Sequence, residues 1–338
     1  MGPPAPETPD PGVVLGAGRR PPAELVVGSI GVRPDTRLAA MAGLDIGPNG
    51  GIAVSSTGQT SDPHIYAVGD AVEKTDQVSG ASSLIALANV ANRQGRRVAD
   101  HIAGLPVHAA PSLGTAIVKV FGLTVAMTGW NERRLLAAGR DHRCVHSHPM
   151  NHASYYPGAE QMAMKLLFDP TAGEILGAQA VGGSGVDKRI DVIATAMTGG
   201  ITAPQLADLE LAYAPPFSSA KDPVNMLGYM AENVLSGSCD VAGPADLPAL
   251  RERGWTVVDV RTEREHAAAH IPGTVNVPLD ELRERLPALG SGPFVVYCQV
   301  GQRGHTAASL LHEDGHLARN LDGGYLTWRD WDAAHHRA

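Results

Sequence analysis

Apolar residues in the first third of the chain gather in short runs of the kind that strands make. The runs lie at residues 13–15, 25–32, 51–57 and 65–68. Glycine, proline or polar residues end each run, so we predict short strands joined by turns. Between residues 83 and 103 the spacing changes, and Leu84, Leu87 and Val90 recur at helical intervals. This stretch is predicted to be a helix.

Residues 112–236 mix both kinds of pattern. Predicted strands lie at 115–121, 123–129, 161–169 and 174–182, and predicted helices lie at 131–138, 187–197 and 223–235. Strands of antiparallel type mixed with helices predict an α+β domain.

Small and polar residues from 236 to 247 are typical of a linker. Beyond this stretch strands and helices alternate, which predicts a small parallel α/β domain. The predicted strands lie at 256–260, 274–278 and 294–298, and the predicted helices at 280–286 and 306–313. We therefore expect a multidomain fold, α/β and α+β, with domains at 1–108, 109–236 and 237–338.

Composition excludes several classes of protein. Hydrophobic residues make up 43% of the 338 residues and charged residues 18%, which argues against a disordered chain. The formal net charge of -8 disfavours binding to nucleic acid. No apolar stretch reaches the roughly 18 residues of a membrane-spanning helix, and the proline-rich N-terminus lacks the features of a signal peptide. We expect neither a nucleic acid nor a membrane as partner.

The three cysteines are Cys144, Cys239 and Cys298. Their odd, small number does not suit a disulfide framework and fits a reducing cytoplasm, where we expect the protein to reside. The Gly-Ala-Gly at 16–18 is weak support for a dinucleotide-binding loop. Two arginines and two prolines follow it, and tandem proline prevents the helix that such a loop requires.

Cys298 ends a buried-looking strand and precedes a short loop and a helix. Backbone N–H groups of such a loop and the helix dipole favour a negatively charged sulfur. Arg303 adds a cation, and Gly301 and Gly304 let the backbone curl. A thiolate held in this way is a nucleophile. The alternative is that Cys298 is an ordinary small buried residue.

The residues around this loop resemble a rhodanese domain over about 240–332. The matching stretches are Asp259–Arg261, the HIPGTVNVP run from His270, C-x-x-G-x-R from Cys298 to Arg303, and Leu321–Gly324. The resemblance implies a persulfide carried on Cys298, with Arg303 beside it. Asp259, Arg261 and His270 are expected to maintain the fold.

The segment Thr60–Asp70 resembles the second FAD signature of the pyridine nucleotide-disulfide reductases. It runs T, four residues, an apolar residue, an aromatic residue and A-x-G-D. The resemblance implies that Thr60, Gly69 and Asp70 belong to an FAD site, with Asp70 bonding to the ribitol chain. The other interpretation is an ordinary Gly-Asp turn.

Residues 112–236 are similar to the dimerisation domain of coenzyme A-disulfide reductases with a fused rhodanese domain. The block YAPPFSSAK contains Tyr213 and Lys221, and a second block contains His152, Tyr155 and Tyr156. The resemblance places Tyr213 near the flavin of a partner subunit. It makes Lys221, His152 and Tyr156 substrate-binding residues. The tyrosines could instead pack in the core, and Lys221 could form a surface ion pair with Asp222.

Several histidines lie in one strand-like stretch, which makes a metal site one interpretation. The stretch contains His142, Cys144, His146 and His148, with His152 nearby. On a strand Cys144, His146 and His148 share a face and could hold zinc. No second ligand pair lies close in sequence, so no metal is expected.

Three parts of the reductase half are not found in this sequence. They are a G-x-G-x-x-G loop for FAD, a second such loop for NAD(P)H, and an N-terminal redox cysteine. The resemblance therefore implies the C-terminal part of an FAD- and NAD(P)H-dependent coenzyme A-disulfide or persulfide reductase, a homodimer that acts on a small thiol, persulfide or coenzyme A substrate. The chain alone is expected to hold little FAD. The alternative is a stand-alone rhodanese sulfurtransferase that uses the remainder as a dimerisation scaffold.

Overall fold

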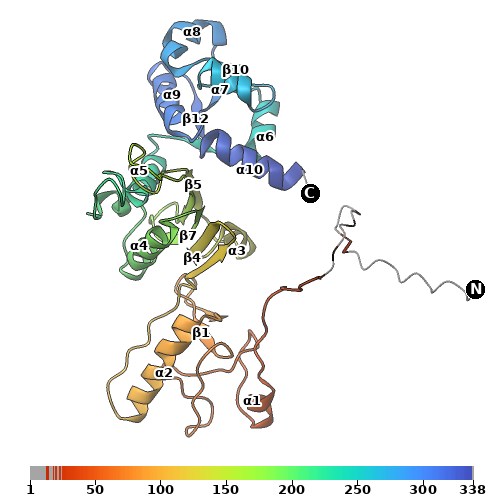
Figure 1. The fold of residues 1–338 in the computed structure, drawn as a ribbon, viewed down its shortest axis with the longest axis vertical. Coiled ribbons are helices and arrows are strands. Elements are labelled where there is room, and N and C mark those ends of the chain that lie inside the picture. The colour runs from red at the N-terminus through yellow and green to blue at the C-terminus, as the bar shows by residue number, and fades with distance from the viewer. Residues whose placement is uncertain (1–12, 15–17, 19, 21–22, 24, 337–338) are drawn as a thin grey trace, which may run out of the picture.

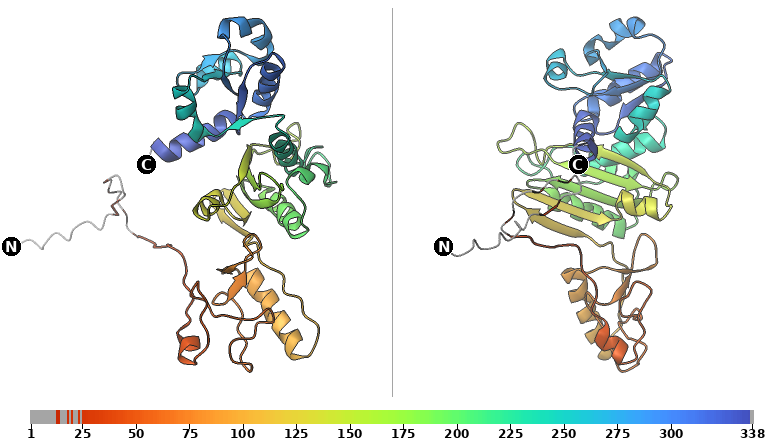
Figure 2. Two further views of the ribbon diagram at one scale, coloured as in Figure 1. Left: turned by 180° about the vertical axis from the view of Figure 1, so that it is seen from behind. Right: turned by 90° about the vertical axis from the view of Figure 1, so that its right-hand side faces the viewer.

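The computed structural model describes residues 13–14, 18, 20, 23 and 25–336. Three parts follow one another in chain order along its long axis (Figures 1 and 2). We call them the N-terminal part (25–111), the antiparallel domain (112–236) and the parallel domain (239–336). The two domains each contain a five-stranded sheet, antiparallel in the first and parallel in the second. The fold is thus multidomain and mixed α/β, as predicted.

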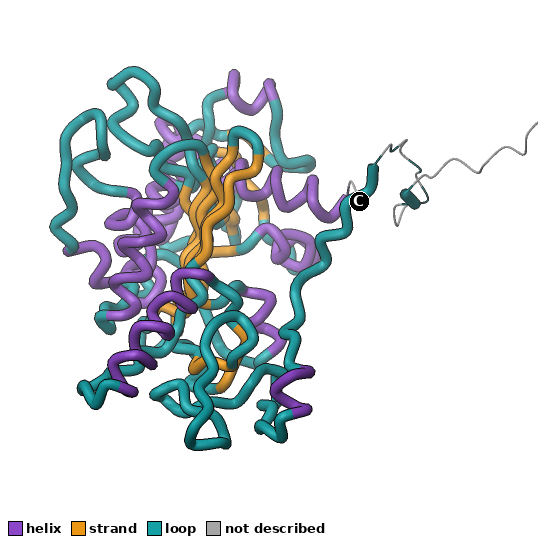
Figure 3. Tube along the Cα trace, turned by 60° about the horizontal axis from the view of Figure 1, so that its bottom comes forward, coloured by secondary structure: helices purple, strands orange, loops and turns teal. Residues whose placement is uncertain are grey.

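Loops make up most of the N-terminal part (Figure 3). Its regular elements among the described residues are α1 (Arg37–Met41), β1 (Glu73–Thr75), β2 (Ser82–Leu84) and α2 (Ala88–Ile102). The predicted helix at 83–103 is therefore confirmed only from Ala88 onward. Residues 82–84 pair with β1 as an antiparallel strand instead.

The other strands predicted for this part are wrong or reduced. Residues 25–32 form no strand, and Leu25, Ile30 and Val32 are exposed. An apolar run becomes a strand only where another strand accepts its backbone hydrogen bonds, and no described residue pairs with it. The runs at 51–57 and 65–68 reduce to isolated bridges. The run at 13–15 ends outside the described residues, and its first two residues form no regular element.

The antiparallel domain confirms the strands and helices predicted for it. Its strands in spatial order are β3 (Ala116–Val120), β4 (Leu123–Gly129), β7 (Ile175–Gly182), β6 (Ala163–Phe168) and β5 (Arg143–Ser147). Its helices are α3 (Glu132–Ala137), α4 (Val186–Thr198), the 3-10 turn η1 (Pro204–Asp208) and α5 (Pro223–Leu235). The strand β5, which contains Cys144 and His146, is an edge strand.

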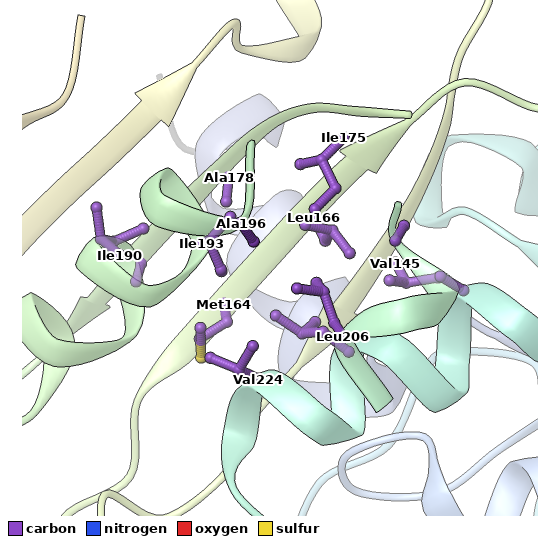
Figure 4. Close-up of a cluster of buried hydrophobic side chains, with 14 of the residues drawn as sticks. Val145, Met164, Leu166, Ile175, Ala178, Ile190, Ile193, Ala196, Leu206 and Val224 are labelled. Atoms are coloured by element: carbon purple, nitrogen blue, oxygen red, sulfur yellow. The ribbon is translucent and has the colours of Figure 1, made fainter. Parts of the chain in front are cut away.

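The core of this domain lies between the sheet and the helices α4 and α5 (Figure 4). Ile190 and Ile193 of α4 and Val224 of α5 pack against Met164 and Leu166 of β6. Burying such side chains stabilises the domain by roughly 1.5–3 kcal/mol each. The start of α5 is set locally, because Asp222 caps the helix and Pro223 occupies its first turn.

The parallel domain alternates strands and helices as predicted. Its strands in spatial order are β10 (Val275–Asn276), β9 (Thr256–Asp259), β11 (Phe294–Tyr297), β12 (Ala318–Leu321) and β8 (Val241–Ala242). Its helices are η2 (Pro244–Asp246), α6 (Leu247–Glu252), α7 (Glu263–Ala268), η3 (Leu279–Glu281), α8 (Leu282–Leu289), α9 (Gln302–Glu313) and α10 (Gly324–His336).

Two predictions for this region need correction. The stretch 236–247 is not linker throughout, because β8 pairs in parallel with β12 and belongs to the sheet. The helix predicted from 306 begins at Gln302, directly after the cysteine loop. No helix in the described part of the chain is long and apolar enough to cross a lipid bilayer.

Candidate functional site

The sulfur of Cys298 belongs to a loop at the carboxyl edge of the parallel sheet. Because β9, β11 and β12 run in parallel, the residues that follow them meet at this edge, which is where such sheets bind ligands. Cys298 directly follows β11, and α9 begins four residues later. Gly301 has a φ of 95° and caps that helix, a conformation that favours glycine. The strand and tight loop predicted around Cys298 are confirmed, and the helix that follows them begins earlier than predicted.

Cys298 is buried, with 1% of its surface exposed. Its carbonyl oxygen accepts a hydrogen bond from the N–H of Tyr325 at 2.8 Å, and that of Gln299 accepts one from Leu326 at 3.1 Å. The loop is therefore held from the side by the residues that follow β12. Burial alone would also suit the small-residue alternative, so the nucleophilic role of Cys298 stays a prediction.

Arg303 reaches both the cysteine and a carboxylate that sequence reasoning missed. Its guanidinium donates to both carboxylate oxygens of Glu265 on α7, at 2.9 and 2.6 Å. The hydrogen bond to Glu265 raises the pKa of Arg303, burial opposes this, and Cys298 adds a smaller rise. Arg303 therefore lies close to the sulfur, but its charge is shared with Glu265.

A buried ion pair supports the cysteine loop. Arg261 bonds to Asp259 through Nε and Nη2, at 3.0 and 2.7 Å, and its Nη1 donates to Oε1 of Gln299 at 3.0 Å. Burial by itself would raise the pKa of Asp259, but hydrogen bonds from Arg261 and His266 outweigh it and lower that pKa. Asp259 holds Arg261, and Arg261 in turn bonds to the loop, which is consistent with the fold-maintaining role expected of both.

The Glu265–Arg303 pair predicts a pH-dependent contribution to stability. Hydrogen bonding to Arg303 lowers the pKa of Glu265 to about 2 from a model-compound value of 4.5. A lowered carboxyl pKa stabilises the folded state above pH 4.5, and this contribution is lost as the pH falls toward 2. Glu265→Gln keeps the cap on Thr262 and removes the charge, so we expect it to destabilise at pH 7 by less than about 1 kcal/mol, the range of partly exposed pairs.

Urea unfolding of wild type and Glu265→Gln at pH 7, 5 and about 3.5 checks this prediction. The difference in unfolding free energy should shrink at the lowest pH. A difference that is the same at every pH would show that the charge of Glu265 does not matter.

The two predicted substrate blocks of the antiparallel domain come together in space. The N–H of Ala153 donates to the carbonyls of Pro215 and Ser218, at 3.3 and 3.0 Å, which joins the loop after β5 to the loop before α5. The hydroxyls of Tyr155 and Tyr213 lie 3.2 Å apart. Both tyrosines are exposed, which argues against the core-packing alternative.

His152 and Tyr156 form the other half of this cluster. His152 is buried and meets the ring of Tyr156 edge-on at 5.7 Å between centroids. Its Nδ1 lies 3.1 Å from the carbonyl oxygen of Ala153. The structure thus brings His152, Tyr155, Tyr156 and Tyr213 into one cluster, while their roles stay predictions.

A buried arginine that sequence reasoning missed holds these two loops. Arg189 of α4 donates to the carbonyl of Asn151 at 2.8 Å, to Ser218 at 3.2 Å and to the carboxylate of Asp222 at 3.0 Å. Arg189 and Asp222 are both almost fully buried. The detectable signal was an arginine on the apolar face of the predicted helix at 187–197.

Lys221 does not form the surface ion pair with Asp222 that is the alternative to substrate binding. Asp222 pairs with Arg189 and Lys188 instead. The ammonium group of Lys221 lies 5.5 Å from the ring centre of Tyr229. It also lines a cleft of about 320 Å³ between the two domains. Val300, Gly301 and Gln302 of the cysteine loop line the same cleft.

The segment Thr60–Asp70 fits one end of a flavin cofactor. Gly69 has a φ of 94°, and no atom lies within 4 Å of the position that a Cβ would take. Its N–H donates to Gln94 of α2 at 3.0 Å, and Asp70 beside it is exposed. The hydroxyl of Thr60 donates to carbonyl oxygens of its own turn, those of Asp62 and Ile65. Gly69 and Asp70 thus leave room for a polar chain such as ribitol, and Thr60 shapes the turn.

Tyr213 belongs to the antiparallel domain, whereas the segment Thr60–Asp70 belongs to the N-terminal part. The site residues therefore divide into three groups: the flavin-type segment, the tyrosine cluster with Lys221, and the cysteine loop.

His146 of β5 and His148 just after it make contacts between the two domains. His146 bonds to Asp322 at 2.6 Å through Nδ1, and His148 lies 2.7 Å from the hydroxyl of Thr327 through Nε2. Possible metal-ligand atoms of Cys144, His146 and Asp322 lie within 4.8 Å of one another. The hydrogen bonds account for the two histidines without a metal, and the metal-free interpretation stays a prediction.

Comparison with known families agrees with this division of the chain. Residues 6–95 match the family described as pyridine nucleotide-disulphide oxidoreductase. Residues 115–223 match the dimerisation domain of the same family, and the two matches together cover more than half of the chain. Residues 243–330 match the rhodanese-like domain.

Curated relatives resemble a little under two thirds of the chain. A coenzyme A disulfide reductase of Staphylococcus haemolyticus is 34% identical over 212 residues, which are 62% of this chain and 48% of the relative. An NADH oxidase of Methanocaldococcus jannaschii is 35% identical over 219 residues, which are 63% of this chain and 47% of the relative. The chain spans about half the length of these relatives.

Two solved structures resemble nearly the whole chain. The structure of reduced Bacillus anthracis CoADR-RHD is 44% identical with a TM-score of 0.90, covering 94% of this chain and 58% of that one. A NAD-dependent persulfide reductase from A. fulgidus is 38% identical with a TM-score of 0.85, covering 92% and 57%. The chain therefore belongs to the pyridine nucleotide-disulphide oxidoreductase family and carries a rhodanese-like domain after the dimerisation domain.

Proposed function

We propose that the chain acts in an FAD-dependent coenzyme A-disulfide or persulfide reductase whose rhodanese-like domain carries sulfane sulfur on Cys298. The observation that carries this proposal is the cleft between the two domains. Lys221 of the dimerisation domain and residues 300–302 of the cysteine loop line it together. One small thiol or persulfide bound there would contact both halves of the protein.

The sulfur chemistry needs only a thiolate, a donor and an acceptor. The thiolate of Cys298 attacks the outer sulfur of thiosulfate, the S–S bond of the donor breaks, and sulfite leaves with the electron pair. Cys298 then carries a persulfide. An acceptor thiolate attacks the outer sulfur, leaves with it as a new persulfide, and returns the Cys298 thiolate. Arg303 and the N–H groups at the start of α9 would stabilise the negative sulfur.

FAD and NAD(P)H belong to this proposal through the family. When bound, FAD would accept a hydride from the nicotinamide and pass two electrons to a disulfide or persulfide sulfur. Gly69 and Asp70 would hold the ribitol end of FAD, and Tyr213 would approach the flavin of a partner subunit. All three cysteines are free thiols, which supports a cytoplasmic setting.

The second candidate is a sulfurtransferase that uses the remainder of the chain as a dimerisation scaffold. It is favoured by the completeness of the parallel domain, whose sheet, cysteine loop and buried ion pair are all present. Both candidates require sulfur on Cys298, and they differ in the flavin chemistry.

One experiment tests both candidates. The purified full chain is treated with thiosulfate or polysulfide, and mass spectrometry locates added sulfur. In parallel, flavin content and oxidation of NADH or NADPH with coenzyme A disulfide are measured.

An upstream in-frame DNA extension that encodes G-x-G-x-x-G and a cysteine would favour the reductase. Flavin-dependent oxidation of NADH or NADPH would also favour the reductase. Sulfur loading with no such extension encoded upstream would favour the sulfurtransferase, and no sulfur on Cys298 would contradict both.

The dimerisation domain also predicts a homodimer through residues 112–236. Apolar side chains of the β3–β4 hairpin are exposed, among them Ile117, Val118 and Phe121. A twofold interface would bury such a patch against its own copy. We expect a dimer at micromolar concentration, and Phe121→Asp should raise its dissociation constant about tenfold or more. Sedimentation checks this, with Leu317→Asp in the rhodanese-like domain as the matched exposed control; a monomeric wild type would contradict the prediction.

A further inference from the structure

The edge strand β5 of the dimerisation domain forms hydrogen bonds with the loop that follows β12 of the rhodanese-like domain. The backbone N–H of His146 donates to Oδ1 of Asp322 at 2.8 Å, and Nδ1–H of the same residue donates to Oδ2 at 2.6 Å. β5 has no partner strand on this side, so its N–H is available for the carboxylate. One residue thus satisfies both oxygens of Asp322.

Asp322 is buried, with 3% of its surface exposed. A buried carboxylate is stable only when its oxygens are hydrogen-bonded, so the bonds from His146 matter to its position. The N–H of Asp322 donates to the carbonyl of Ala242 at 2.9 Å, which ties the same residue to β8. Asp322 is therefore fixed from both domains.

Two glycines continue the contact from Asp322 to the cysteine loop. A Cβ on Gly323 would lie 2.8 Å from the Cβ of His146, so this glycine packs directly against the dimerisation domain. A Cβ on Gly324 would collide with the carbonyl oxygen of Cys298. The next residue, Tyr325, donates its N–H to that same carbonyl at 2.8 Å. His146, Asp322, Gly323, Gly324 and Cys298 thus form one continuous line of contacts.

We propose that His146 of the dimerisation domain is a positioning residue for the sulfur-carrying loop of the rhodanese-like domain, acting through Asp322. The dimerisation domain is then part of the sulfur-transfer machinery and more than a scaffold. Without the Nδ1 bond, one oxygen of Asp322 loses its partner, and the turn at 322–326 no longer holds the carbonyls of Cys298 and Gln299 in one place. The proposal rests on the proposed sulfur transfer at Cys298.

Three variants of the full chain separate positioning from general stability. His146→Ala removes the ring donor, whereas His146→Asn offers a side-chain N–H at nearly the position of Nδ1. His142→Ala is the matched control, because His142 lies near a carboxylate of its own domain, Glu132, at 3.6 Å. We expect His146→Ala to load sulfur from saturating thiosulfate about tenfold more slowly, with an unchanged half-saturating concentration, as for a lost contact of about 1.4 kcal/mol. His146→Asn should recover most of the rate, and His142→Ala should retain it.

A double-mutant cycle tests the route through Asp322. Asp322→Ala removes both bonds from residue 146, so it should lose at least as much rate as His146→Ala. The variant that combines His146→Ala with Asp322→Ala should lose no more than Asp322→Ala alone, because the ring bond is already gone. If the double variant loses rate by the product of the two separate fold-decreases, the proposal is overturned. Wild-type loading in His146→Ala, or an Asn variant as slow as the Ala variant, would overturn it as well.

Amide hydrogen exchange reads the same contact without any sulfur chemistry. The N–H groups of Tyr325 and Leu326 should exchange about tenfold faster in His146→Ala than in wild type or His146→Asn, because local opening becomes easier. Equal exchange in all three would overturn the positioning role. Failure of wild type to load sulfur would instead contradict the proposed function, and the exchange result would still decide the role of His146.

Discussion

Replacing Cys298 by serine should abolish sulfur loading and leave the fold intact. Serine is nearly isosteric with cysteine but cannot form a persulfide, so transfer should fall by at least about a thousandfold, the scale seen when an essential nucleophile is removed. Mass spectrometry after thiosulfate treatment should find added sulfur on Cys298 in wild type and none in the variant. Thermal unfolding of the two proteins should be similar.

The other two cysteines provide matched controls. Burial, with a smaller contribution from Asp322, raises the pKa of Cys144 to about 12, and burial raises that of Cys239 to about 11. Both thiols therefore stay protonated at neutral pH and are poor nucleophiles. Cys144→Ser and Cys239→Ser should load sulfur like wild type. Undiminished transfer in Cys298→Ser, or sulfur found on Cys144 or Cys239 alone, would show that the rhodanese interpretation is wrong for this chain.

Arg189→Met should cause a large loss of stability in the dimerisation domain. It leaves the carboxylate of Asp222 buried without its main cation, and it frees the carbonyl of Asn151 and the hydroxyl of Ser218. Breaking a buried pair by removing one partner costs about 3–5 kcal/mol. Urea unfolding, followed by a probe in this domain, should show the loss.

Lys188→Met is the matched control, because Lys188 faces the same carboxylate at 3.5 Å but is about a third exposed. Partly exposed pairs contribute less than about 1 kcal/mol, so this variant should unfold close to wild type. Equal losses in the two variants would mean that burial of Arg189 is not what gives the pair its importance. Arg189→Met should also disorder the two loops that Arg189 joins, the one after β5 and the one before α5.

The local structure of the cysteine loop and of the start of α5 could be predicted from the sequence, because the residues that form each of them are close neighbours along the chain. The loop from Cys298 to Arg303 contains its own turn glycine and helix start, and Asp222 with Pro223 marks the beginning of α5. The antiparallel strands were readable for the same reason, since each alternates or continues its apolar pattern within a few residues. The run at 25–32 has that pattern too, yet forms no strand, because pairing depends on a partner elsewhere.

The contacts that complete the site join residues far apart in sequence, and only the tertiary structure decided them. Glu265 competes with Cys298 for Arg303 across 38 residues, and His146 meets Asp322 across 176 residues. A carboxylate and a cation at such separations leave no periodic or motif signal, because many other partners would satisfy them equally well in an unfolded chain. The sequence by itself therefore determined the strand, loop and helix around Cys298, on which the proposed sulfur chemistry depends. Tertiary packing, within the parallel domain and between its 322–326 turn and β5, decided which side chains hold that loop.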